Sequence, residues 1–176
     1  LLITMLSLGI KPNTKVFLPA FTYTASAEAI CLLGATPVFV DVEPQTFLLS
    51  PCKLRLAMEK HSSPGDLIMP VDLFGYPCDY DELVSVAREF SAKIFVDGAQ
   101  GFGAEYKNSS CFYGIEAFCT SFFPAKPLGC FGDGGAIYTN NSELADICRS
   151  VRNHGMGDDK YDIKRVGVNG RLDTVQ

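Results

Sequence analysis

The fold class is decided by the stretch Ala92-Lys93-Ile94-Phe95-Val96-Asp97-Gly98-Ala99-Gln100. A short apolar run that ends in an acidic residue and a glycine is typical of a strand buried in a parallel sheet. Open α/β sheets place their ligands at the carboxyl ends of such strands, where Asp97 stands. A carboxylate buried there without a partner is costly. The pattern therefore predicts either a bound group that donates a proton to Asp97, or a following helix that Asp97 caps.

On both sides of this stretch, strand and helix patterns alternate along the chain. Strands are predicted at residues 15–19, 36–42, 66–71, 93–97, 117–121 and 135–138, and helices at 24–33, 51–60, 79–90 and 142–153. Short apolar strands separated by helices indicate an α/β fold, with a mostly parallel sheet sandwiched by helices. Residues 1–10 predict the second half of a helix that Gly9 and Pro12 end, so we expect the chain to be truncated at its start.

Composition predicts a globular protein. The chain has 176 residues, 47% hydrophobic and 20% charged, which suffices for one core. It has no run of about 18 apolar residues, so no membrane association is expected. The seven cysteines are odd in number and form no C-x-x-C pair, which favours reduced cytoplasmic thiols over a disulfide or metal framework. The net charge of -5 argues against nucleic-acid binding.

A candidate nucleophile lies in Thr120-Ser121-Phe122-Phe123-Pro124-Ala125-Lys126. An apolar setting lowers a lysine's pKa and makes the amine available to form an imine. A lysine imine together with an aspartate on a pyridine nitrogen is the arrangement that holds pyridoxal 5'-phosphate (PLP), so Lys126 and Asp97 together predict this cofactor. The plainer alternative places Lys126 in a loop with its ammonium group in solvent.

Six ordered motifs resemble those of the DegT/DnrJ/EryC1/StrS family, PLP-dependent aminotransferases of nucleotide-activated keto sugars. They are 17–30, 33–42, 97–104, 121–135, 152–155 and 167–173. The resemblance runs over nearly the whole chain. It implies that residues 1–176 are the PLP-binding large domain of a fold type I enzyme, truncated at both ends, so that the amino-terminal phosphate loop and the small carboxyl-terminal domain are absent.

The resemblance also implies roles for individual residues. Lys126 would bind the cofactor and move the proton, and Asp97 would contact the ring nitrogen. Tyr23 would stack on the ring, Gln100 would contact the 3-hydroxyl group, and Ser121 would help to hold the phosphate. Without the family, Tyr23 could be a core tyrosine, Gln100 a turn residue and Ser121 a strand-end serine.

Two further residues bear on the active site. Asn169 matches the family's asparagine that reaches the cofactor phosphate of a neighbouring subunit, which implies a homodimer with a shared active site. Taken alone, Val168-Asn169-Gly170 is a turn signal. We discount His154 as the catalytic acid or base, because the family places its motif near the dimer interface and Lys126 is the better base.

The implied reaction moves an amino group from an amino acid, with L-glutamate expected, to a keto group of a nucleotide-linked deoxysugar. The implied pathways make cell-surface polysaccharides or the sugars of secondary metabolites. Two alternatives stay open: a sugar dehydratase-type relative, which would carry histidine in place of Lys126, and a non-catalytic regulatory protein on the same fold. Gly98 stands where the family usually has alanine, a change that we expect to matter little.

Overall fold

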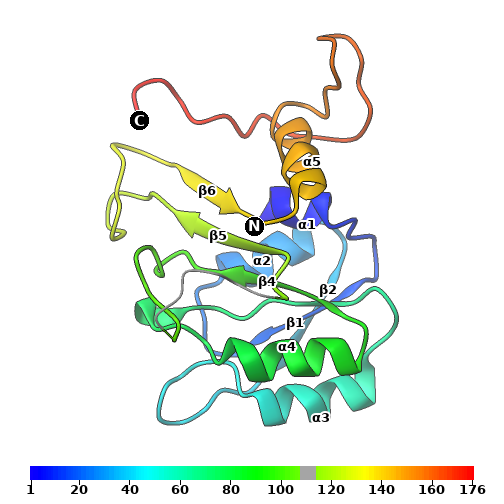
Figure 1. Ribbon diagram of the computed structural model, residues 1–176, viewed down its shortest axis with the longest axis vertical. Helices are drawn as coiled ribbons and strands as arrows, with labels where there is room; N and C mark the ends of the chain where they lie inside the picture. The colour runs from blue at the N-terminus through cyan, green and yellow to red at the C-terminus, as the bar shows by residue number, and fades with distance from the viewer. Residues whose placement is uncertain (108–113) are drawn as a thin grey trace.

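A computed structural model describes residues 1–107 and 114–176, and its strands form one twisted sheet (Figure 1). The strands are β1 (Lys15–Pro19), β2 (Thr36–Val40), β3 (Leu67–Ile68), β4 (Lys93–Asp97), β5 (Ala117–Ser121) and β6 (Gly135–Tyr138). Their order across the sheet is β2-β1-β3-β4-β5-β6. Neighbours from β2 to β5 are parallel, and only β6 runs antiparallel, against β5. The predicted mostly parallel sheet is confirmed.

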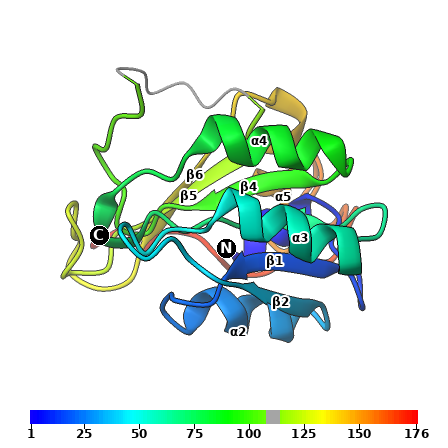
Figure 2. The same ribbon diagram turned by 90° about the horizontal axis from the view of Figure 1, so that it is seen from below.

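Helices cover both faces of this sheet, as Figures 1 and 2 show. The helices are α1 (Leu2–Ser7), α2 (Ala25–Leu32), α3 (Pro51–His61), α4 (Tyr80–Glu89) and α5 (Ser142–Arg152), with a 3-10 turn η1 at Leu73–Gly75. Helices α3 and α4 pack side by side on one face, and α1, α2 and α5 share the other. The predicted α/β sandwich is confirmed.

Alternation along the strands separates two apolar cores. In β4, Ile94 and Val96 pack toward α3 and α4, whereas Phe95 packs toward α1, α2 and α5. In β1, Phe17 joins the first core, and Val16 and Leu18 join the second. Successive side chains of a strand point to opposite faces, so a strand covered on both sides must be apolar throughout.

The predicted boundaries needed two larger corrections. The strand predicted at 66–71 is reduced to Leu67–Ile68, because Pro70 has no N–H with which to continue the ladder. The chain nonetheless stays alongside β4, since the Asp97 N–H donates to the Pro70 carbonyl at 2.9 Å. The strand predicted at 36–42 ends at Val40, and Val42 instead forms an antiparallel bridge with Leu49.

Across the two described ranges, none of the helices combines the length and the apolar content that a transbilayer helix requires.

Candidate functional site

A cavity of about 780 Å³ opens at the carboxyl ends of β3, β4 and β5. The first turn of α2 and the start of β6 complete its wall. Five of the six residues predicted for the site line it: Tyr23, Asp97, Gln100, Ser121 and Lys126. Residues that are 103 positions apart in the sequence, from Tyr23 to Lys126, therefore meet at one edge of the sheet.

Asp97 is the buried carboxylate of this cavity, with 4% of its surface exposed. The Ser26 hydroxyl donates to its Oδ2 at 2.7 Å, and the Ala99 N–H donates to its Oδ1 at 3.2 Å. No ion pair joins Asp97 to a cation in the described part of the chain, and no helix follows it before residue 107, so the capping alternative is wrong. Because a carboxylate can accept about four hydrogen bonds, Asp97 can accept another from a ligand.

Lys126 lies in the loop that follows β5, where its N–H donates to the Phe123 carbonyl at 2.8 Å. Its side chain is half-buried and lines the cavity beside Phe123 and Ala125. Within residues 1–107 and 114–176, no hydrogen bond or ion pair engages its ammonium group. The amine is thus available to a group bound in the cavity.

Three polar or aromatic side chains complete the predicted set. Tyr23 is 77% exposed, so it is not a core tyrosine and presents its ring at the cavity wall. The Gln100 Oε1 accepts from the Phe74 N–H at 2.8 Å. The Ser121 Oγ accepts from the Phe123 N–H at 3.2 Å, which leaves the hydroxyl hydrogen for another acceptor.

Asn169 is the predicted site residue that the structure does not bring into the cavity. It is exposed and pairs with Asn153 in an isolated antiparallel bridge. His154 likewise lies outside the cavity lining. A contact of Asn169 with another subunit stays a prediction.

Sequence reasoning missed three buried polar residues of the site, Ser26, Asp72 and Thr120. Asp72 follows β3 just as Asp97 ends β4, so the same strand-end signal could have identified it. It is 1% exposed, and it accepts hydrogen bonds from the Tyr80 hydroxyl and, at 3.1 Å, from the Cys78 N–H. Burial raises its pKa to about 6, although these two hydrogen bonds act to lower it. No spacing pattern would have revealed Ser26.

Gly98 matters more than we expected from the sequence. A Cβ atom at this position would lie 1.8 Å from Cζ of the Phe118 ring. A Cβ atom on Gly101 would lie 3.2 Å from the same Phe118 atom. The Phe118 ring therefore fits directly under the loop that carries Asp97 and Gln100, and only a residue without a side chain fits above it.

Comparisons with known proteins agree with this arrangement. The profile of the DegT/DnrJ/EryC1/StrS aminotransferase family matches residues 1–176. The chain is 47% identical to UDP-2-acetamido-2-deoxy-3-oxo-D-glucuronate aminotransferase of Pseudomonas aeruginosa, over 99% of this chain and 47% of that protein. It is 39% identical to a protein named pleiotropic regulatory protein of Geobacillus stearothermophilus, over 99% of this chain and 46% of that protein.

Among solved structures, the fold matches Streptomyces venezuelae DesV in complex with a ketimine intermediate. The TM-score is 0.90 at 37% identity, over 97% of this chain and 45% of that chain. The chain thus spans about half the length of the relatives that it matches.

Proposed function

Because the chain belongs to the DegT/DnrJ/EryC1/StrS aminotransferase family, we propose that the protein is a PLP-dependent transaminase of nucleotide-linked keto sugars. The amino donor is an amino acid, with L-glutamate the first candidate. One observation carries the proposal: the fold gathers Lys126, Asp97 and Gln100 around a single cavity at the edge of the sheet. Lys126 comes from a different segment than Asp97 and Gln100, and a protein that binds no such cofactor has no chemical need for this set.

The residues present fit PLP. Asp97 is buried, and within the described part of the chain its hydrogen bonds come from neutral donors alone, so it lacks there the cationic partner that a buried carboxylate needs. A protonated pyridine nitrogen supplies one. The unengaged amine of Lys126 suits covalent attachment. When bound, the cofactor supplies an electron sink for the charge that develops on the donor's α-carbon.

The chain's own residues then have distinct tasks. Lys126 Nζ moves the proton that leaves the donor's α-carbon. Asp97 keeps the ring nitrogen protonated, and Ser26 and the Ala99 N–H hold its carboxylate in place. Tyr23 offers a flat apolar face for stacking, and the Ser121 hydroxyl is a donor for the phosphate.

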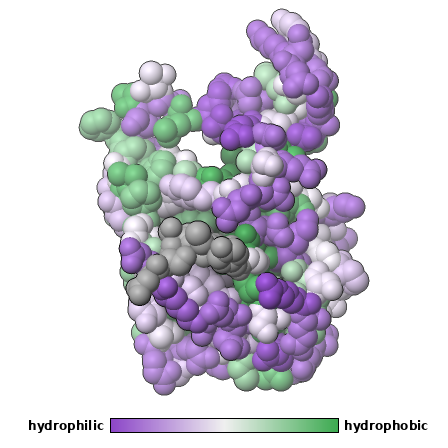
Figure 3. Space-filling model, viewed as in Figure 1, coloured by the Kyte–Doolittle hydropathy of each residue, from purple (hydrophilic) through white to green (hydrophobic). Residues whose placement is uncertain are grey.

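We extend the proposal to assembly and cellular setting. The protein would be a cytoplasmic homodimer in which Asn169 reaches the partner's site, and it would act in polysaccharide or secondary-metabolite sugar synthesis. Exposed apolar side chains support a partner: Figure 3 shows them gathered over the loop between β5 and β6, where Phe123 and Phe131 are 50% and 88% exposed. Such patches mark interfaces. Residues 1–176 would be the large domain of the enzyme.

A regulatory role is the second candidate, because one relative carries a regulatory name. A protein that only binds a partner would not need Lys126 at the cavity. The dehydratase alternative is disfavoured by the same residue, since it would carry histidine there.

The deciding experiment is an absorbance spectrum of the full-length protein with PLP, before and after L-glutamate. We expect a near-visible band that bleaches with L-glutamate, and that is absent from Lys126→Ala. Lys11→Ala removes an exposed lysine outside the cavity and serves as the matched control, which should keep the band. If the wild-type protein shows no band, or if Lys126→Ala keeps transaminase activity, the proposed function is wrong.

A further inference from the structure

Asp72 lines the cavity and links the turn at residues 72–78 to the end of β4. Its N–H donates to the carbonyl of Asp97 at 3.0 Å, which ties it to the end of β4. Its carboxylate accepts from the N–H of Cys78 and from the hydroxyl of Tyr80 on α4. The Asp72 carbonyl accepts from the Gly75 N–H at 3.1 Å. One buried residue therefore connects both ends of the segment 72–78.

The turn that Asp72 fastens is strained. Phe74 has a φ of 59°, in the left-handed region that a bulky side chain rarely adopts. Gly75 follows with a φ of 79°, and a Cβ atom there would lie 2.8 Å from the Gln100 carbonyl oxygen. A conformation of this kind persists only where its surroundings hold it, and hydrogen bonds to a buried carboxylate are among the stronger ones.

The strained residue orients Gln100. The Phe74 N–H donates to Gln100 Oε1 at 2.8 Å, so the acceptor end of the amide is occupied by the protein. The end that remains for a ligand in the cavity is the NH2 group, which only donates. If the turn moved, Gln100 could present either end.

We propose that Asp72 is a positioning residue that, through the Phe74 N–H, fixes the Gln100 amide so that it presents its NH2 donor to the 3-oxygen of the bound cofactor. This inference rests on the proposed function. A donor to that oxygen favours its deprotonated form and lowers the pKa of the bound chromophore. Asp72 itself touches no reacting atom.

Whether Asp72 stabilises the turn that contains Phe74 can be tested without cofactor. In Asp72→Asn, amide hydrogen exchange at Phe74 should become roughly tenfold faster, because a charged acceptor is lost from the turn. Asp41→Asn is the matched control, since Asp41 also follows a parallel strand but lies outside the cavity lining, and Phe74 exchange should be unchanged in it. Unchanged exchange at Phe74 in Asp72→Asn would overturn the proposal.

The route through Gln100 is tested by a pH titration of the near-visible band in the PLP-loaded, full-length protein. Asp72→Asn and Gln100→Ala should each raise the chromophore pKa, by about one unit for a lost donor. The double variant should match Gln100→Ala alone, because Asp72 acts through that residue. A further shift in the double variant would contradict the proposal.

A second variant and a second readout cover the cases in which Asp72→Asn does not fold or no chromophore forms. If Asp72→Asn does not fold, Tyr80→Phe removes a single hydrogen bond to Asp72 and should shift exchange and chromophore pKa in the same direction by less. If no near-visible band forms in the wild-type protein, the proposed function fails, while the exchange of Phe74 still decides whether Asp72 holds the turn.

Discussion

The ends of β2 and β4 carry the same sequence pattern but differ in chemistry. Each strand is a short, largely apolar run followed or closed by an aspartate, Asp41 in one case and Asp97 in the other. The Asp41 side chain is 71% exposed and forms an ion pair with Lys53 at 2.6 Å. Asp97 is 4% exposed, and among residues 1–107 and 114–176 it bonds only to neutral donors.

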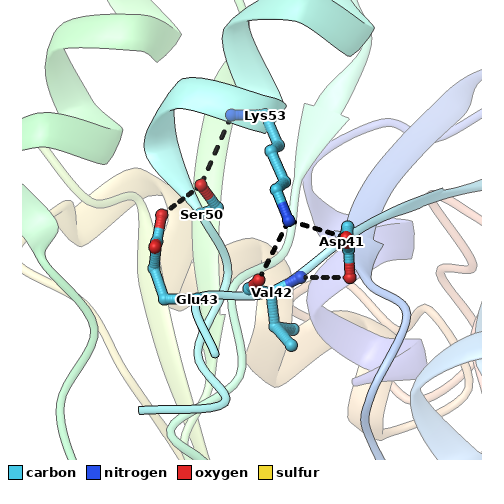
Figure 4. A network of polar contacts seen from close by, with 5 residues as sticks. All are labelled: Asp41, Val42, Glu43, Ser50 and Lys53. Atoms are coloured by element: carbon cyan, nitrogen blue, oxygen red, sulfur yellow. Dashed lines mark hydrogen bonds and ion pairs between the residues drawn. The ribbon is translucent and has the colours of Figure 1, made fainter. Parts of the chain in front are cut away.

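The surroundings of Asp41 are those of a helix start (Figure 4). Ser50 caps α3 by accepting from the Lys53 N–H at 3.4 Å, and its hydroxyl donates to Glu43. The Lys53 ammonium group reaches back to Asp41 and to the Val42 carbonyl. Every charge in this network meets an opposite charge or a donor within the chain, so Asp41 has the cationic partner that Asp97 lacks among the described residues.

In this sheet, a strand-end aspartate marks a site only where its strand lies in the interior. Strand β2 is an edge strand, so water and Lys53 reach its end, whereas β4 lies between β3 and β5. The neighbouring strands and α2 bury Asp97 and create a need for a partner that Asp41 does not have.

The largest difference between the ends of β2 and β4 is expected when the aspartate at each end loses its charge. Asp97→Asn should lower the rate of the amino-donor half-reaction about 10²- to 10³-fold, because the ring nitrogen loses its anionic partner. Asp41→Asn should change it by no more than about twofold. Single-turnover absorbance with L-glutamate measures both variants, and equal losses would mean that the comparison does not reflect function.

The next largest effect is expected on the free energy of unfolding, when the residue after each aspartate is changed. Gly98→Ala should lower the free energy of unfolding by about 1–3 kcal/mol, because the new Cβ atom meets the Phe118 ring. Combining it with Phe118→Leu should recover part of the loss. Val42→Ala, at the matching position after Asp41, should cost less than about 1 kcal/mol. Urea denaturation tests the series, and a neutral Gly98→Ala would contradict the packing argument.

A third prediction concerns Asp72, the other interior strand-end carboxylate. Its pKa is raised to about 6 in the folded protein, from an ordinary value of 3.8, so the folded state binds its proton more tightly than the unfolded state does. The wild type should therefore lose about 1–3 kcal/mol of stability relative to Asp72→Asn as pH rises from about 4 to 7, through the folded pKa, with no further change above. Urea denaturation of both proteins across this range measures the difference. A difference that stays constant with pH would refute it.

The smallest effect is expected at the exposed ion pair between Asp41 and Lys53. Hydrogen bonding to Lys53 lowers the pKa of Asp41, so any stabilisation is present above an unfolded pKa of about 4 and is lost as pH falls below it. Water screens the pair, and Lys53→Ala should shift the melting temperature by no more than about 2 °C at neutral pH. Differential scanning calorimetry at low and high salt checks this, and a large salt-independent shift would show that the pair is not a surface interaction.

The alternation of strands and helices, and with it the class of fold, could be predicted from the residues alone. Apolar periodicity and turn residues are local, so β4, β5 and β6 were predicted with the bounds that the structure gives them. The resemblance of three motifs to those of the family, 17–30, 97–104 and 121–135, also identified five of the residues that line the cavity.

Which strand-end carboxylates are buried, and which residues bond to them, could be seen only in the folded chain. Ser26 reaches Asp97 across 71 positions of sequence, and Phe118 dictates a glycine at position 98 from the next strand. Asp72 and Asp41 carry the same local signal and were separated by the order of strands in the sheet. The physical reason is that burial and partner geometry depend on contacts between distant segments, which no local pattern encodes.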